Sequence, residues 1–345
     1  MEPLNGRPNL LKRANLSLIR RAIRDRGTAT RAEIAEETRI SSTTVRSLLA
    51  ELLENGEIEG IGYDESSGGR KAERYALCPE RYHSAAFCIT GSRMDALIVN
   101  VCGEIVETAR MDVGGGEYEA AIDAYLAGAA AAREIRSIGV GVPGIVEGGG
   151  FRRKNERGEL CEISLGKALA ERYGVPVVLE NDLNATAIGF GRRYGRERPE
   201  GDSGCGDMAY LHFERDCVSA GFLAGGRILR GSGNFAGELG LLPLGDGRLL
   251  DEHIAAAADD AAYVRLVALT VRWVCGVLNP RLVVLGGPDF RADCAEAIRG
   301  EVLARLPERM RAEILYSPEV WDDYHAGMAQ LTAAKMFDEV QLLKE

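Results

Sequence analysis

Small polar side chains and one arginine are gathered in residues 41–46, which read Ser-Ser-Thr-Thr-Val-Arg. Hydroxyl and guanidinium groups of this kind form hydrogen bonds with the base edges and phosphates of DNA. A second group, Gly-Arg-Lys at residues 69–71, adds two cations to a glycine-rich stretch. DNA contact is therefore the first chemistry to consider, with the candidates Arg31, Ser41, Ser42, Thr43, Thr44, Arg46, Gly69, Arg70 and Lys71.

Two short helices are predicted to position the first group. Apolar residues have helical spacing at Ile34 and Ala35, and again from Val45 to Leu53. The three residues 39–41 between them leave room only for a tight turn, and Ser41 or its neighbour can cap the second helix. The polar group then lies at the N-terminus of that helix, where a recognition helix presents its side chains to DNA.

The flanking segments extend this pattern to a winged helix-turn-helix. A further helix is expected from about Leu10 to Asp25, and residues 58–63 and 74–77 can pair as a hairpin. The tip of that hairpin carries Arg70, which suits insertion into a narrow minor groove. The alternative is an ordinary helical hairpin followed by a charged, solvated turn.

Charge is divided unevenly along the 345 residues. The net charge is −10, yet residues 1–80 hold 13 Lys+Arg and 13 Asp+Glu, so the rest of the chain carries the whole excess. A neutral N-terminal segment is far from a strongly basic domain. It favours sequence-specific docking as a dimer over a general coating of DNA.

Composition favours a cytoplasmic protein with no membrane partner. No apolar run approaches the ~20 residues that span a bilayer, and the first residues lack the apolar core of a secretion signal. The eight cysteines are scattered without a Cys-x-x-Cys pair. They are expected to be buried thiols rather than a disulfide framework.

The remainder alternates predicted strands with helices, which indicates an α/β architecture. Strand, turn and strand are expected from His83 to Val101, a buried strand at 135–146, and a looser segment at 147–162. The expected helices run from Tyr118 to Arg133, near 164–173, from Asn184 to Tyr194, from Ala255 to Leu278, and from Tyr324 to Leu343.

One glycine pattern imitates a nucleotide site. Gly139, Gly141 and Gly144 have the spacing of a dinucleotide fingerprint after a strand. That fingerprint needs a helix to begin at its end. Pro143 and the following Ile-Val-Glu-Gly-Gly-Gly cannot begin one well, so we do not expect a nicotinamide cofactor.

Four segments of the body, in order, resemble blocks of the ROK family (repressors, open reading frames and sugar kinases). They are GVGVPGIV (139–146), PVVLENDLNATAIG (176–189), GRILRGSGNFAGELG (226–240) and NPRLVVLGG (279–287). The similarity covers nearly all of the chain, and a preceding winged helix is the layout of the family's transcriptional repressors.

The resemblance implies a two-lobed, actin-like ATPase (ribonuclease H-like) fold with a sugar site between the lobes. We therefore expect an α/β body behind an α+β winged helix-turn-helix. The expected domains are the winged helix at 1–80, a first lobe at 81–200, and a shortened second lobe at 201–345. In this layout the C-terminal helix can return to the first lobe.

The phosphate loops of the family's kinases are not matched. Where the first loop usually has Asp-x-Gly-Gly-Thr, this chain has Cys-Ile-Thr-Gly-Ser at 88–92, so the carboxylate is missing. The glycine-rich second loop is replaced by residues 214–221, in which Glu214 and Asp216 would repel phosphate.

The family's zinc ligands are not matched either. Leu241 stands where relatives carry a His, and no cysteine occurs between Cys217 and Cys275. Without ligands of the required type, no structural metal is expected.

Part of the sugar machinery is retained. Asp182 matches the general base of the kinases, which leaves it a vestigial base here. Asn181 and Glu238 match groups that bind sugar hydroxyls, and Asn155 matches a further sugar-contacting position. Alternatively, Asp182 caps the helix that follows it and Glu238 braces a glycine loop.

We therefore predict a kinase-inactive transcriptional regulator, in first place a repressor. It would bind a double-stranded operator as a homodimer or higher homo-oligomer, sense a sugar or sugar derivative, and need no cofactor. The alternatives are an ATP-dependent sugar kinase with an accessory DNA-binding domain and a regulator that senses no ligand.

Overall fold

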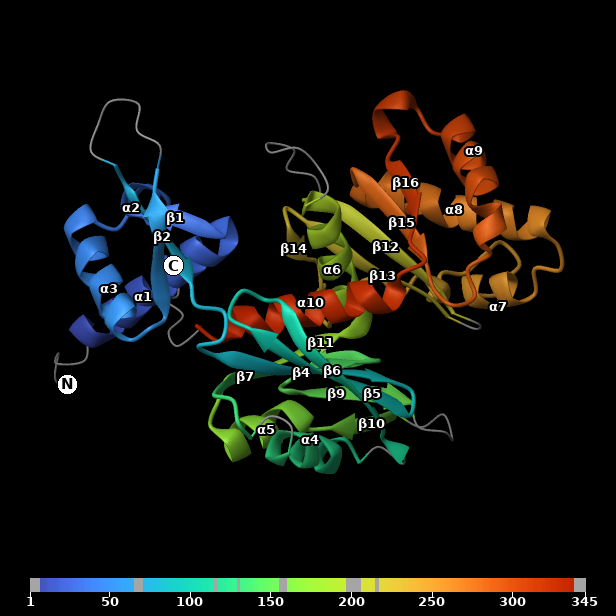
Figure 1. The fold of residues 1–345 in the computed structure, drawn as a ribbon. Helices are drawn as coiled ribbons and strands as arrows, with labels where there is room; N and C mark the ends of the chain where they lie inside the picture. Colours follow the sequence, from blue (N-terminus) through green and yellow to red (C-terminus); the bar gives the residue numbers. More distant parts are fainter. Residues whose placement is uncertain are drawn as a thin grey trace. The chain divides into compact units, whose positions relative to one another are not determined.

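The computed structural model describes residues 7–64, 71–114, 117–128, 131–154, 160–196, 206–214 and 217–337 (Figure 1). The chain divides into two compact units. Unit 1 comprises Met1–Val140, Leu165–Val178 and Ala329–Glu345, and unit 2 comprises Gly141–Ser164 and Leu179–Met328. The domain boundaries expected at residues 80 and 200 stay predictions.

The first part of unit 1 contains the predicted helices and hairpin. In chain order these are α1 (Arg7–Arg26), β1 (Thr28–Thr30), α2 (Arg31–Thr38), α3 (Ser42–Glu54), β2 (Ile58–Tyr63) and β3 (Glu73–Leu77). The three strands form an antiparallel sheet in the order β1-β3-β2. The predicted turn before α3 contains Arg39 in the left-handed conformation (φ 57°), and Ser41 caps α3 by accepting the Thr44 amide at 3.2 Å. This element order is that of a winged helix-turn-helix.

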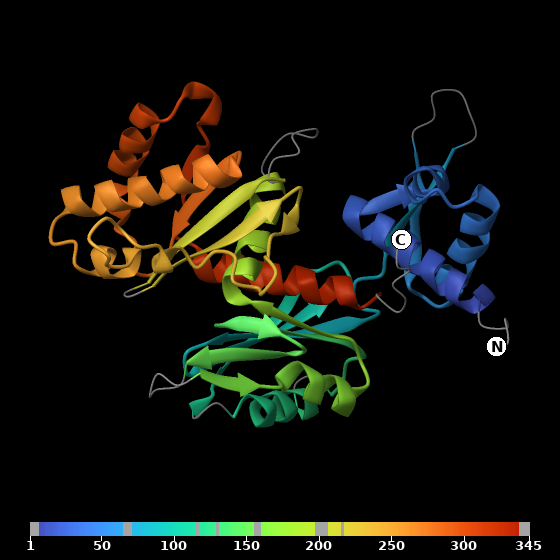
Figure 2. The same ribbon diagram turned by 180° about the vertical axis from the view of Figure 1, so that it is seen from behind.

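The second part of unit 1 is built on a five-stranded sheet of order β11-β7-β4-β5-β6. Its strands are β4 (His83–Thr90), β5 (Arg93–Asn100), β6 (Ile105–Asp112), β7 (Ile135–Val142) and β11 (Val177–Asn181). Helices α4 (Tyr118–Ala127) and α5 (Leu165–Tyr173) lie together on one face, as both views show (Figures 1 and 2). The prediction that this helix extends to Arg133 is wrong. The helix ends at Ala127, because the backbone leaves the helical conformation at Gly128 (φ −95°, ψ −93°).

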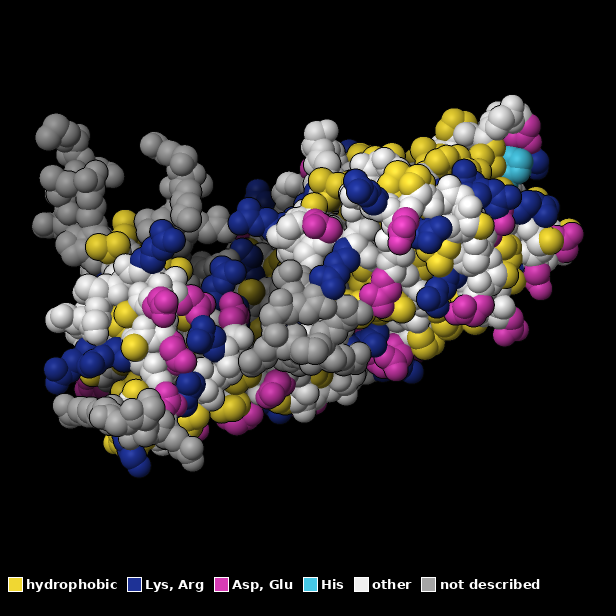
Figure 3. Space-filling view, turned by 90° about the horizontal axis from the view of Figure 1, so that it is seen from above, with side chains coloured by type: hydrophobic (Ala, Val, Ile, Leu, Met, Phe, Trp, Pro, Cys, Tyr) yellow, Lys and Arg dark blue, Asp and Glu magenta, His cyan; other side chains and the backbone are white. Residues whose placement is uncertain are grey.

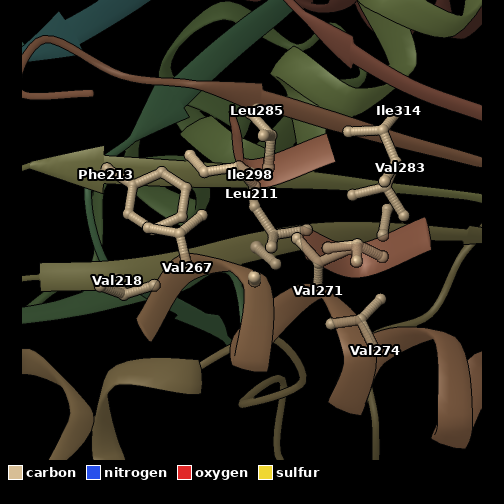
Figure 4. Close-up of a cluster of buried hydrophobic side chains, with 14 of the residues drawn as sticks. Leu211, Phe213, Val218, Val267, Val271, Val274, Val283, Leu285, Ile298 and Ile314 are labelled. Carbon is tan, nitrogen blue, oxygen red and sulfur yellow. The ribbon is translucent and has the colours of Figure 1, made fainter. Parts of the chain in front are cut away.

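Unit 2 is built on a second sheet of order β14-β13-β12-β15-β16. Its strands are β12 (Met208–Glu214), β13 (Cys217–Ala224), β14 (Arg227–Ile228), β15 (Leu282–Gly286) and β16 (Glu313–Tyr316). Side chains alternate between the two faces, as the strand period requires. Leu211, Val283 and Leu285 pack with helix α8 (Asp260–Leu278) and helix α9 (Ala295–Arg305), as Figure 4 shows. Tyr210 and Val284 pack instead with helix α6 (Asp182–Arg196).

Several elements of unit 2 differ from the prediction. The segment 147–162, expected to be loose, contributes to a small antiparallel sheet of β8 (Ile145–Glu147), β9 (Gly150–Lys154) and β10 (Leu160–Ile163). The helix expected from Ala255 to Leu278 begins only at Asp260 as α8, because Asp259 caps it through the Ala262 amide at 2.7 Å, and a short helix α7 (Leu250–Ala255) precedes it. Helix α9 and strand β16 were not predicted.

Helix α10 (Val320–Lys335) explains the misleading glycine pattern. A side chain at Gly139 would overlap with Thr332 of α10, and one at Gly141 would overlap with the Tyr324 ring. Gly144 has φ +137°, a conformation that other residues rarely adopt. The three glycines therefore allow close packing and a turn rather than access for a dinucleotide.

Helix α8 is long and apolar enough to cross a membrane by length and composition alone. This corrects the expectation that no apolar stretch of the chain approaches that length. Its residues Val267, Val271 and Val274 are buried against the sheet, as Figure 4 shows. We therefore assign its hydrophobicity to the core of unit 2.

Candidate functional site

A groove in the first part of unit 1 gathers four of the candidate DNA contacts. It has a volume of about 680 Å³. Arg31 of α2, Ser42 and Arg46 of α3, and Lys71 of the hairpin all line it. Three cations along one groove suit the phosphates of a nucleic acid.

The remaining candidate DNA contacts differ in whether their side chains form the cap of α3. The Ser41 hydroxyl accepts the Thr44 amide and is 2.8 Å from the Thr44 hydroxyl, so both side chains serve the helix end. Ser42, Thr43 and Arg46 are exposed beside them. Gly69 and Arg70 lie outside the described residues.

Two aromatic residues in the groove were not foreseen. Tyr63, at the end of β2, is 64% exposed, and Tyr75 of β3 lines the same groove. Their alternation with small residues in the hairpin was the only available signal. Figure 3 shows basic and acidic side chains interspersed over the face that it draws.

A second cavity, of about 210 Å³, lies within unit 2 and is lined mostly by polar side chains. This cavity, named the effector pocket for its proposed role, is formed by Val146, Glu147, Gly148, Glu180, Asn181, Asn184, Arg230 and Asn234. Its residues come from the turn after β8, the junction of β11 with α6, and the glycine-rich loop after β14. Of the expected effector contacts that the structure describes, Asn181 lines it, and Asp182 and Glu238 do not.

Hydrogen bonds fix the polar wall of the effector pocket. The buried Glu180 carboxylate accepts from the Asn184 side chain at 3.0 Å and from the Arg230 guanidinium. Asn181 caps α6 by accepting the Leu183 and Asn184 amides at 3.0 and 3.1 Å. Asn234 has a left-handed backbone (φ 58°) and donates to the Val146 carbonyl at 2.7 Å. The polar side chains of this wall are therefore held by contacts within the protein.

Two other expected effector residues, Asp182 and Glu238, have carboxyl groups with raised pKa values. Burial raises the pKa of the Asp182 carboxyl to about 6, while His212 and the Leu183 amide act against that shift. Burial and the nearby Asp251 carboxylate also raise the pKa of Glu238. Neither residue lines the effector pocket, and Asn155 lies outside the described residues.

The segment compared with the second phosphate loop, residues 214–221, contributes to two paired strands. Strands β12 and β13 are paired from Met208 with Leu223 to Glu214 with Cys217. Asp216 lies outside the described residues. The first loop is likewise the turn of the β4–β5 hairpin, with Thr90 opposite Arg93.

In the segment compared with the family's zinc loop, side-chain hydrogen bonds join Asp246 to Arg248 and His253. Asp246 lies 2.8 Å from Arg248 and 2.9 Å from the His253 ring, and these two partners lower the pKa of its carboxyl. Leu241 is 57% exposed. Within the described ranges, no three His, Cys, Asp or Glu side chains are grouped so that they could hold a metal ion.

The chain is similar to several transcriptional repressors. It is 29% identical over 253 residues to a candidate xylose repressor of Caldicellulosiruptor sp. (strain Rt8B.4), covering 68% of this chain and 60% of that protein. It is 24% identical over 255 residues to the DNA-binding transcriptional dual regulator NagC of Escherichia coli (strain K12), covering 70% and 61%. The chain thus spans about 60% of the length of these relatives.

Solved structures show the fold. A ROK family transcriptional regulator, a homologue of the E. coli MLC protein, matches 95% of this chain and 98% of its own at 15% identity, with a TM-score of 0.73. A ROK hexokinase from Thermus thermophilus matches 72% and 97% at 21% identity, with a TM-score of 0.56. The expected actin-like ATPase fold is therefore confirmed. Residues 89–257 match the ROK family, and the chain carries a ROK family domain.

Proposed function

We propose that this chain is a kinase-inactive transcriptional regulator that binds an operator through its first 77 residues and senses a small polyol in unit 2. The observation that carries the proposal is the groove in which Arg31, Ser42, Arg46 and Lys71 meet. A recognition helix with a basic wing is a common device for reading DNA. The relatives named as repressors support the same function.

Arg46→Ala is expected to weaken operator binding about 10- to 100-fold, as the loss of one base or phosphate contact does. The side chain lies on the exposed face of α3 and lines the groove. Binding is measured by fluorescence anisotropy on DNA selected from a random library with the wild-type protein.

The matched control is Arg110→Ala on β6, whose side chain is 68% exposed and lies outside the first 77 residues. It should bind within twofold of wild type. Equal losses for the two variants would contradict the assignment of the groove.

The effector pocket fits an uncharged ligand of monosaccharide size. Its volume is below the ≈ 300–1,000 Å³ typical of pockets for drug-sized ligands. Arg230 is paired with Glu180, and Glu147 is paired with Arg152 at 2.7 Å, so a phosphate would have to compete with a carboxylate for either cation. Amide and carboxylate acceptors suit the hydroxyls of a sugar.

Unphosphorylated sugars are therefore expected to stabilise the protein, and their phosphate esters are not. A true ligand at 100 times its dissociation constant adds ~2.7 kcal/mol of stability. A thermal-shift screen of pentoses, hexoses and N-acetylated amino sugars, each with its phosphate where one exists, measures this.

Asn234→Gly provides the site test, because glycine tolerates the left-handed backbone while the amide is removed. Asn279→Gly is the matched control, since Asn279 has φ 47° but caps α8 away from the effector pocket. The sugar-induced shift should be lost only in the first variant. Larger shifts with the phosphates would overturn the proposed ligand class.

Kinase inactivity is supported by the hairpin that replaces the phosphate loop. Glu214 is paired with Cys217 at the end of β12, so a carboxylate and a thiol side chain stand where backbone would have to approach phosphate. The retained Asp182 favours the rival function, a sugar kinase. ATP turnover with a hexose that is abolished by Asp182→Asn would establish that rival.

A further inference from the structure

Arg74 lies on β3 at the base of the wing hairpin and contacts three other elements. Its Nε donates to the Asp64 carboxylate, just past the end of β2. One Nη donates to the Thr28 hydroxyl of β1 at 3.0 Å and to the Thr28 carbonyl at 3.4 Å. The other Nη donates to the Glu33 carboxylate of α2 at 3.1 Å.

The partner on α2 is itself held in place. Glu33 forms a capping box with Thr30, accepting the Thr30 amide at 2.7 Å and donating its own amide to the Thr30 hydroxyl at 3.3 Å. These contacts with Thr30, followed by Arg74, lower the pKa of Glu33. The Arg74 guanidinium therefore joins the hairpin to the N-terminus of α2, which packs against α3.

Arg74 is poorly suited to bind DNA directly. Its Nε and both Nη groups already donate to protein acceptors, and its side chain is 30% exposed. The Asp64 and Glu33 carboxylates would compete with a phosphate for its guanidinium. The groove lined by Arg46 and Lys71 does not include it.

We propose that Arg74, held by Asp64 and Glu33, is a positioning residue that fixes the wing hairpin relative to the recognition helix α3. Operator affinity then depends on carboxylates that do not touch DNA. The inference rests on the proposed DNA binding and adds a determinant of the geometry of that interface.

Asp64→Asn distinguishes a positioning role from a purely electrostatic one, because the two predict opposite changes in operator affinity. Removal of a negative charge near DNA should by itself tighten binding. If Asp64 holds Arg74, the wing is released and affinity for the selected operator falls about tenfold, as for a lost wing contact. Glu59→Gln is the control, an exposed acid on β2 of the same hairpin, and should bind as well as wild type or slightly better.

Arg74→Lys is the second variant. It keeps the charge but replaces a planar fork that donates from three nitrogens, so it should lose as much affinity as Asp64→Asn. The loss should not add to that of Lys71→Ala, because a displaced wing has already given up the Lys71 contact. Circular dichroism at the temperature of the assay identifies folded variants, and either folded variant is sufficient.

Tighter or unchanged binding by Asp64→Asn or Arg74→Lys, or full additivity with Lys71→Ala, overturns the positioning role while DNA binding stands. Failure of the wild-type protein to enrich any DNA sequence overturns both the proposed function and this inference.

Discussion

Gly189→Ala is expected to destabilise unit 2 by about 3 kcal/mol, at the upper end of the range for overpacking. A side chain at Gly189 of α6 would overlap with the Asp323 carbonyl and the Gly327 amide of α10. A side chain at Gly327 would in turn overlap with the Ala185 carbonyl. The two helices cross with their backbones in contact, and backbone atoms cannot move aside as a flexible side chain can.

The matched control lies six residues further along the same helix. Gly195 has nothing within 4 Å of the position of an added Cβ, so Gly195→Ala should leave stability unchanged or raise it by up to about 1 kcal/mol. Urea unfolding followed by circular dichroism compares the two midpoints. If the two variants unfolded at similar urea concentrations, the close contact between α6 and α10 would not contribute to stability, and the prediction would be wrong.

Local patterns in the sequence predicted the helix-turn-helix well. The cap at Ser41, the turn at Arg39 and the hairpin ending at Leu77 follow from residues adjacent in the chain, because capping and turn formation are local interactions.

Elements that depend on distant partners were missed. The three short strands between Ile145 and Ile163 have little strand character and are stabilised by pairing with one another. Helix α9 has only Ile298 and Val302 buried, which gives a weak apolar period. The break before α8 depends on Asp259, whose capping role was hidden in an otherwise continuous helical pattern.

The candidate site divides in the same way. Ser42 and Arg46 were found because a recognition helix is a local motif. The effector pocket was not, since the ion pair of Glu180 with Arg230 joins residues 50 positions apart and no spacing rule connects them. The glycines around Asn234 indicated a loop, but only the fold brings that loop to the Val146 carbonyl.

Arg20→Met is expected to destabilise the helix-turn-helix by about 3–5 kcal/mol. Arg20 of α1 donates from Nε and Nη2 to both oxygens of Glu57 at 2.7 and 2.9 Å, and the side chains are 13% and 5% exposed. Glu57 lies between α3 and β2, so the variant leaves a buried, unpaired carboxylate beside the recognition helix. Hydrogen exchange of the α3 amides measures the loss.

The double variant Arg20→Met/Glu57→Met should recover most of that stability, because a buried ion pair can be replaced by apolar side chains at little loss. Lys12→Met is the matched control, since Lys12 also joins α1 to α3 through Glu51 at 2.8 Å, but with side chains that are 48% and 33% exposed. Breaking this exposed pair should change stability by less than about 1 kcal/mol. If Arg20→Met were no more harmful than Lys12→Met, the guanidinium would be dispensable to the fold.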